Sequence, residues 1–286
     1  MGTASAPKQI IFIMPELPEV ETICRGLRPH LKNRRILRVK VFEPRLRHPV
    51  DLNLPALLRG QTIVDVVRRA KYILINLNEK NVWVFHLGMS GKLIHVAPKT
   101  PKQKHDHIIV TLDNGQELRY HDPRRFGLSL LVPKNELQGM PQMRSLGLDP
   151  FDAQFDGSYL YFFTRRSNRR IRDLLLDQQV VAGIGNIYAN EILSRASVRP
   201  TARSSRLTRA QVERIAVTMP QVLEEAIRWC GTSFSDYRDA DDKFGEFQNH
   251  LRVYDRHGEA CRICARAIKR VALGNRSAFY CPSCQK

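Results

Sequence analysis

The sequence of 286 residues lacks any long apolar run. None approaches the ~18 residues that a transmembrane helix needs. The apolar run at residues 10–14 is also too short for a signal-peptide core. Internal repeats and low-complexity tracts are absent too. A hydrophobic fraction of 43% still suffices for packed cores, so disorder of the whole chain is excluded. We therefore expect a soluble cytoplasmic protein of about two domains, at ~100–200 residues each.

Acidic residues are scarce relative to basic ones. The chain has 28 Asp and Glu against 46 Lys and Arg, which gives a formal net charge of +18. An excess of this size predicts a polyanionic partner. Nucleic acid is the first candidate, with a membrane surface and an acidic protein as the alternatives.

Cysteines are few, but four of the six are regularly spaced. They form two Cys-x-x-Cys pairs, Cys261 with Cys264 and Cys281 with Cys284, separated by sixteen residues. This spacing predicts a four-thiolate zinc site in a reducing compartment. Two disulfides are the alternative, which the lack of a secretory signal disfavours. Four thiolates leave no open coordination position, so the zinc ion should be structural.

The first part of the chain has the composition of β-strands. Residues 73–75 and 82–85 are short β-rich runs, and residues 107–120 predict a hairpin with Asn-Gly in its turn. Ahead of them, apolar residues recur at helical spacing over residues 19–31. We therefore expect a β-sandwich with a leading helix.

From about residue 143 the pattern becomes helical. Apolar spacing predicts helices at residues 159–163, 171–176, 187–193 and 212–227. Thr208 and Gln211 have the spacing of a capping box before the last of these helices. Residues 231–250 lack regular apolar spacing and predict a loop. The expected fold is α+β and multidomain, with domains at residues 14–144, 145–250 and 251–286.

Residues 14–22 read MPELPEVET, which by itself indicates only an acidic helix N-terminus. The string resembles the N-terminus of the formamidopyrimidine-DNA glycosylase family, which repairs oxidised bases. Further strings match that family in order, from residue 14 to residue 286. They are RAKY (69–72), HLGMSG (86–91), DPRRFG (122–127), GIGNIY (183–188) and the two cysteine pairs. The resemblance implies a helix–two-turn–helix domain with a lesion-recognition loop at 231–250, followed by a β-hairpin zinc finger.

The resemblance also implies catalytic roles. Pro15 would be the nucleophile, because a neutral N-terminal secondary amine can attack the sugar C1′ and form a Schiff base. Glu16 would be the acid/base at the sugar-ring oxygen. Lys71 matches the family's basic residue near the lesion and its phosphate. Glu19 and Glu191 match two further carboxylates near the site, where they would support lesion binding and proton transfer.

Three more matching residues would fill the gap that a flipped nucleotide leaves in duplex DNA. Met89 would supply a flexible apolar plug and Phe126 a wedge, while Arg124 would bind the orphaned base. Taken without the family, Met89 and Phe126 would more often be core residues.

Other matches concern the DNA backbone. Asn186 and Arg276 match the family's phosphate-binding residues, and the glycines before Asn186 would bring backbone amides close to phosphate. Arg172 stands where the family favours lysine. His107 predicts either a phosphate contact or a polar histidine satisfied within the fold. Five arginines within residues 165–172 predict contacts with the DNA backbone, with a solvated charged face as the alternative.

The resemblance implies a bacterial DNA glycosylase and AP lyase, a monomer in the cytoplasm near the nucleoid. It would remove 8-oxoguanine and formamidopyrimidines from damaged duplex DNA and cleave the strand by β,δ-elimination. Endonuclease VIII-like specificity for oxidised pyrimidines is one alternative, because residues 239–244 depart from the family's glycine-bearing loop. A non-catalytic zinc-finger DNA-binding protein is the other. Residues 1–13 precede Met14, so either Met14 is the true start or an extension abolishes the lyase chemistry.

Overall fold

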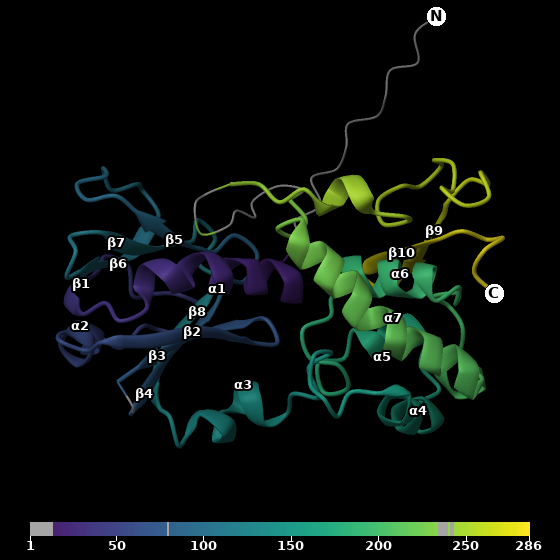
Figure 1. Ribbon diagram of the computed structural model, residues 1–286, viewed down its shortest axis with the longest axis horizontal. Coiled ribbons are helices and arrows are strands. Elements are labelled where there is room, and N and C mark those ends of the chain that lie inside the picture. Colours follow the sequence, from purple (N-terminus) through teal and green to yellow (C-terminus); the bar gives the residue numbers. More distant parts are fainter. Residues whose placement is uncertain (1–13, 79, 234–239, 241–242) are drawn as a thin grey trace, which may run out of the picture.

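The computed structural model describes residues 14–78, 80–233, 240 and 243–286. Two four-stranded antiparallel sheets form its N-terminal part, with strand orders β1-β6-β7-β5 and β2-β3-β4-β8 (Figure 1). The predicted β-sandwich with a leading helix is confirmed. The strands are β1 (Ile36–Val41), β2 (Ile63–Arg69), β3 (Tyr72–Leu77), β4 (Asn81–His86), β5 (Lys92–Val96), β6 (Asp106–Leu112), β7 (Glu117–His121) and β8 (Leu128–Pro133).

The predicted hairpin is formed by β6 and β7, with Val110 opposite Leu118. Gly115 adopts a φ of +80° in the connecting turn, a conformation that an Asn-Gly pair readily supplies. A short helix between β1 and β2, α2 (Leu54–Leu58), was not predicted from the sequence. It is only five residues long, too short for a helical apolar period to stand out.

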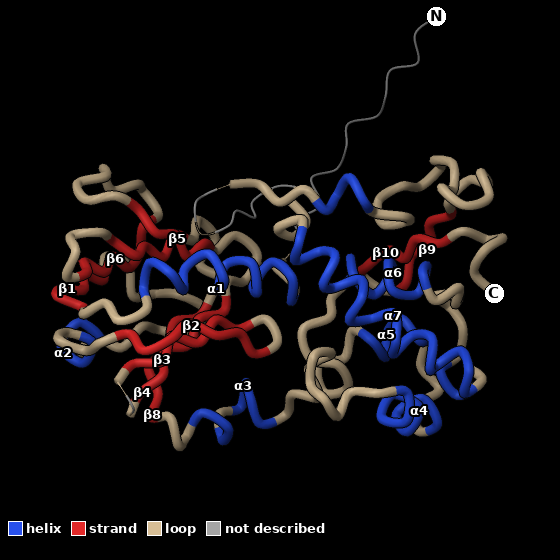
Figure 2. The backbone as a smooth tube through the Cα atoms, in the orientation of Figure 1, coloured by secondary structure: helices blue, strands red, loops and turns tan. Residues whose placement is uncertain are grey.

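The leading helix α1 (Leu17–Leu31) joins two hydrophobic cores. Its first residue, Leu17, packs in the core of the helical part, whereas Val20 and Leu27 pack in the core between the sheets. In Figure 2 the strands of both sheets gather on one side of the molecule and most helices on the other, with the N-terminal end of α1 near the boundary. The residues just before Leu17 are therefore held where the two parts meet.

The helical part contains the four predicted helices, with each end within three residues of the prediction. They are α4 (Gly157–Arg165), α5 (Ile171–Leu175), α6 (Asn186–Arg195) and α7 (Arg209–Arg228). Thr208 caps α7 through its side chain, which accepts a hydrogen bond from the Gln211 amide at 3.2 Å, as the capping box predicted. Preceding this part are the 3₁₀ turn η1 (Leu137–Gly139) and α3 (Pro141–Arg144). Within the described residues, no helix is long and apolar enough to cross a membrane.

Of the predicted lesion-recognition loop at 231–250, residues 234–239 and 241–242 lie outside the described residues, as does the 1–13 segment. The loop's end is ordered as the 3₁₀ turn η3 (Phe247–His250). Phe247 is fully buried and stacks with Tyr188 at 5.9 Å between ring centroids. This anchor was not predicted from the sequence, because a single apolar residue gives no periodicity.

The C-terminal hairpin consists of β9 (Lys269–Leu273) and β10 (Arg276–Tyr280). Figure 1 draws it beside α6. Asn190 on α6 accepts a hydrogen bond from the Phe279 amide at 2.7 Å, and Phe279 belongs to the same core as the helices. The hairpin is thus fixed to the helix whose N-terminal end forms part of the site described next.

Candidate active site

The Glu16 carboxylate lies against the N-terminal end of α6, more than 160 residues along the chain. Its oxygens accept hydrogen bonds from the backbone amides of Gly185, Ile187 and Tyr188 at 2.8, 2.9 and 3.3 Å. The amide of Leu17 donates to the Gly183 carbonyl at 3.0 Å. A negative side chain is favourable at a helix N-terminus, where free amides and the helix dipole both attract it. Glu16 therefore docks the start of the N-terminal part onto the helical part.

Burial and charge act on Glu16 in opposite directions. The residue is 3% exposed, and this burial raises its pKa from 4.5 to about 7, against the effects of Lys71 and the helix amides. Lys71 is 9% exposed, and burial lowers its pKa even though Glu16 and Glu19 favour its charged form. A buried acid and a buried base with pKa values moved toward neutrality can exchange protons with a substrate near pH 7.

Glu19 supports this arrangement from the first turn of α1. Its carboxylate accepts hydrogen bonds from the Glu16 amide at 2.9 Å, the Thr232 amide at 2.8 Å and the Tyr188 hydroxyl at 2.5 Å. Burial raises its pKa as well. Glu19 thus ties the residue next to Pro15 to the first residues of the 231–250 loop.

Close backbone approach explains three glycines around these carboxylates. A Cβ added to Gly185 would lie 2.3 Å from the Glu16 carboxyl carbon, and one on Gly231 would lie 2.8 Å from a Glu19 oxygen. Gly183, with a φ of +94°, would meet Leu17 at 2.8 Å. The glycines before Asn186 were expected to bring backbone amides to phosphate, but the Gly185 amide donates its hydrogen bond to Glu16.

Lys71 shares one edge of a sheet with Met89, Arg124 and Phe126, the three residues predicted to fill the gap in the duplex, which we call the wedge residues. Register aligns Arg69, Tyr72, His86 and Leu128 across β2, β3, β4 and β8. The turn carrying Lys71 connects β2 to β3 at this edge, the turn after β4 carries Met89, and the turn before β8 carries Arg124 and Phe126. Four strand ends therefore bring together residues up to 55 positions apart.

The wedge residues differ in exposure. Phe126 is 44% exposed, which is unusual for a large apolar side chain, and the Arg124 guanidinium lies 4.8 Å from its ring centroid. Met89 is half-buried. A Cβ on Gly88 would come within 2.7 Å of the Phe126 backbone, so the two turns are in direct contact. This exposure disfavours the core alternative for Phe126.

A second polar cluster lies between α5, α6 and the C-terminal hairpin. Asn186 accepts hydrogen bonds from the buried Arg172 guanidinium at 3.0 and 3.2 Å, and its amide nitrogen donates to the Ser277 carbonyl at 3.1 Å. Burial lowers the pKa of both Arg172 and Lys71, and the nearby positive charge of Arg276 acts in the same direction. Tyr254, which the sequence did not single out, hydrogen-bonds Asn186 as well. Lys71 and Arg172 are buried and Arg276 is exposed, so three positive side chains gather at this cluster.

The four paired cysteines come together as the spacing predicted. Their sulfurs all lie within 4.8 Å of one another. A tetrahedral zinc site with Zn–S bonds of about 2.3 Å has sulfurs about 3.8 Å apart. The Sγ atoms of Cys264 and Cys281 are 3.4 Å apart, and those of Cys261 and Cys284 are 4.0 Å apart. The donor set and its spacing fit one structural zinc ion.

Comparison with known proteins identifies the family. Residues 14–129 match the formamidopyrimidine-DNA glycosylase N-terminal domain, 146–238 its H2TH domain, and 258–286 the zinc finger found in FPG and IleRS. A formamidopyrimidine-DNA glycosylase of Hahella chejuensis is 45% identical over 273 residues, 96% of this chain and the whole relative. One of Thioalkalivibrio sulfidiphilus is 46% identical over the same share. The chain belongs to the formamidopyrimidine-DNA glycosylase family.

Solved structures agree with this assignment. Lactococcus lactis Fpg bound to N7-benzyl-Fapy-dG DNA has a TM-score of 0.87 and 31% identity, covering 95% of this chain and 100% of that one. The same enzyme bound to DNA containing an abasic site has a TM-score of 0.88 and 30% identity, covering 95% and 99%. The predicted family, fold and enzyme class, a DNA glycosylase with AP lyase activity, are confirmed.

Two residues carried over from the family engage the protein itself. The Glu191 carboxylate accepts hydrogen bonds from the Arg252, Val253 and Tyr254 amides at 2.8–2.9 Å, so it anchors the segment leading to the zinc finger. These contacts favour an anchoring role over proton transfer. His107 is 5% exposed, and its Nε2 lies 2.7 Å from the Asp122 carbonyl. Of its two predicted roles, this bond favours the histidine satisfied within the fold.

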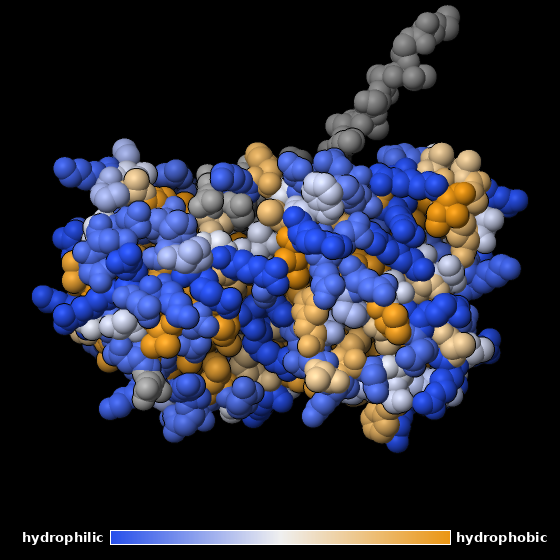
Figure 3. All heavy atoms as spheres, viewed as in Figure 1, coloured by the Kyte–Doolittle hydropathy of each residue, from blue (hydrophilic) through white to orange (hydrophobic). Residues whose placement is uncertain are grey.

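The arginines of 165–172 are divided among different partners. Arg165 donates to the Leu207 carbonyl at 2.5 Å, and Arg166 lies 3.5 Å from the centroid of the Phe162 ring. Arg169 pairs with Asp177. In Figure 1, α4 lies at the opposite edge of the helical part from β9 and β10. These contacts favour a charged face over a shared DNA surface. Figure 3 shows hydrophilic residues over most of the visible face, with hydrophobic ones scattered among them.

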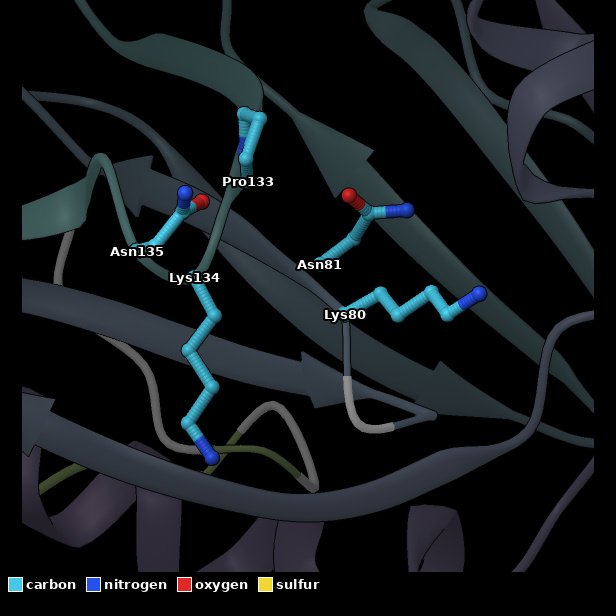
Figure 4. A pocket seen from close by; sticks show the side chains of 5 residues that line it. All are labelled: Lys80, Asn81, Pro133, Lys134 and Asn135. Atoms are coloured by element: carbon cyan, nitrogen blue, oxygen red, sulfur yellow. The ribbon is translucent and has the colours of Figure 1, made fainter.

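A hollow of about 550 Å³ lies far from this glycosylase site. Lys80, Asn81, Pro133, Lys134 and Asn135 line it. Asn81 pairs with Pro133 at the end of the β4–β8 ladder opposite His86 and Leu128. Figure 4 shows the two lysine side chains pointing in different directions, so their charges do not converge.

Proposed function

We propose that Pro15, Glu16 and Lys71 carry the reaction of this glycosylase on oxidised purines, 8-oxoguanine and formamidopyrimidines, in duplex DNA. The neutral amine of Pro15 attacks the sugar C1′, the damaged base leaves, and a Schiff base forms. Loss of a proton from C2′ then breaks the 3′ phosphate bond, and a second elimination breaks the 5′ one. The buried Glu16–Lys71 pair beside Pro15 is the observation that carries this proposal.

Glu16 is the acid in this scheme. Its pKa of about 7 leaves a substantial share of the carboxyl group protonated at neutral pH, so it can protonate the sugar-ring oxygen as the ring opens. An exposed glutamate with a pKa near ~4.3 would hold almost no proton at that pH. The burial that raises this pKa follows from the docking of Glu16 onto α6.

The positive cluster and the wedge hold the DNA. Asn186, Arg172 and Arg276 bind the phosphates that flank the lesion, and Lys71 faces the reacting sugar. The exposed Phe126 enters the base stack with Met89 and Arg124 once the damaged nucleotide is flipped out. The name of the curated relatives and the Fapy-dG in the Lactococcus lactis complex support purine lesions over oxidised pyrimidines. The relatives are bacterial, and the reaction belongs in the cytoplasm, where the chromosome lies.

The reaction requires a free amine on Pro15. When residues 1–14 are attached, its nitrogen is an amide without a nucleophilic lone pair. The family model begins at residue 14, and the relatives' full length corresponds to 273 residues of this chain. We infer that the active form starts at Pro15, with Met14 removed as the initiator methionine; a chain that keeps residues 1–14 would lack the lyase chemistry.

Borohydride trapping on an oxidised-guanine duplex tests this proposal. Protein whose intact mass corresponds to a start at Pro15 should form a covalent adduct, and mass spectrometry of the adduct should map it to Pro15. The 286-residue chain, with the same side chains but an acylated proline, is the matched control and should form none. An adduct on the 286-residue chain, or one mapped to a lysine, would refute the assignment of Pro15.

A further inference from the structure

One buried carboxylate connects the two turns that carry the wedge residues. Asp122 is fully buried. One of its oxygens accepts a hydrogen bond from the Ser90 hydroxyl at 2.6 Å. The other accepts from the Tyr120 hydroxyl at 3.0 Å and from the Gly127 amide at 2.9 Å. The partners of this side chain thus lie on both turns and on β7.

Ser90 links the two turns through its hydroxyl group. Its hydroxyl oxygen, while donating to Asp122, accepts a hydrogen bond from the Arg124 amide at 3.2 Å. Ser90 directly follows Met89, so a single hydroxyl joins the backbone beside one wedge residue to the backbone of another. The contact of Gly88 with the Phe126 backbone adds a steric restraint between the same turns.

The burial of this carboxylate needs an explanation. A buried charge is costly unless hydrogen bonds satisfy it, and three donors satisfy Asp122. Its backbone is held too, because the His107 ring bonds its carbonyl. Holding side chains ready for insertion removes the cost of ordering them when DNA binds. The Asp122 network holds the two turns that carry the side chains proposed to insert into DNA.

We propose that Ser90 and Asp122 are positioning residues that hold Met89, Arg124 and Phe126 as one preassembled wedge. The inference rests on the role of those three residues under the proposed function. Ser90 and Asp122 touch neither the sugar nor the base in this scheme. They act through the relative placement of the two turns.

The test compares Ser90→Ala with Ser129→Ala, a matched buried serine. Ser129 is 2% exposed and accepts a hydrogen bond from Trp83 at 2.9 Å, in the same sheet but off the wedge turns. Ser90→Ala should slow single-turnover excision from a lesion duplex about tenfold, the effect of one lost hydrogen bond at a site where geometry sets the rate. Ser129→Ala should stay within twofold of the original protein.

Two further measurements separate positioning from general damage. Cleavage of a preformed abasic site in single-stranded DNA needs no base flipping, so Ser90→Ala should leave it within twofold. In a Met89→Ala background, Ser90→Ala should add less than threefold to the loss on duplex, because both act through one wedge. Asp122→Asn, which keeps the shape but loses one acceptor, should follow the pattern of Ser90→Ala.

The outcomes distinguish a failure of the wedge role from a failure of the positioning role. If Met89→Ala leaves duplex excision unchanged, the wedge role under the proposed function fails. If Met89→Ala slows excision while Ser90→Ala behaves like Ser129→Ala, the positioning role is overturned and the wedge stands. Equal losses on duplex and single-stranded substrates would also overturn it, since they indicate a structural defect.

Discussion

The protonation of Glu16 can be tested without DNA, through the stability of the fold. Glu16→Gln keeps the size of the side chain and removes its titration. A raised folded-state pKa means that the contribution of Glu16 to stability is fully present below the unfolded value of 4.5. That contribution is lost as the pH rises through about 7. The original protein should therefore lose stability relative to Glu16→Gln across this interval.

The size of the effect follows from the two pKa values. Moving the pKa from 4.5 to about 7 corresponds to about 3 kcal/mol at pH 7, at ~1.4 kcal/mol per pH unit. The three backbone amides that donate to Glu16 act against this change, because they stabilise the ionised form. The sign of the measured difference thus decides whether burial or the helix amides dominate.

Urea unfolding of both proteins at pH 4.5, 5.5, 6.5 and 7.5 is the assay. The free energy of unfolding of the original protein minus that of Glu16→Gln should fall by about 3 kcal/mol over this range. A difference that stays constant, or that rises with pH, would mean that the pKa of Glu16 is not raised and that Glu16 is ionised at pH 7. Glu16 could then not act as the acid at the sugar-ring oxygen, and the proposed mechanism would need another proton donor.

Two other predictions concern the parts that hold the site together. Removal of zinc by a chelator, or Cys281→Ser, should separate the hairpin from α6. DNA binding should then weaken at least tenfold, because Arg276 on the hairpin would no longer be held near the site. Unchanged affinity in a binding titration would contradict this. Arg68 is 7% exposed and pairs with the buried Asp149 of the segment between the two parts. Arg68→Met leaves that carboxylate uncompensated and should cost about 3–5 kcal/mol in urea unfolding. Arg45→Met, which removes an arginine side chain that is 80% exposed, should cost nothing measurable. Equal effects of the two substitutions would show that the Arg68 pair does not stabilise the fold.

Much of the fold was predictable because its signals are local. The hairpin turn at Gly115, the capping box at Thr208 and the cysteine pairs each depend on residues a few positions apart, so spacing alone identifies them. The family motifs then supplied residues whose chemistry spacing could not give. The short helix α2 and the anchor Phe247 escaped, since neither repeats over a helical period.

The sequence by itself determined the family, the order of the sandwich, helical and zinc-finger parts, the zinc ligands and the residues worth testing. Only the tertiary structure decided what their side chains contact. The Glu16 carboxylate accepts hydrogen bonds from the amides of α6, and the Glu191 carboxylate accepts them from the backbone ahead of the zinc finger. Arg172 is buried and donates to Asn186. The physical reason is that hydrogen bonding and desolvation depend on which groups meet in space. Those groups lie up to about 170 residues apart, beyond the reach of any local pattern.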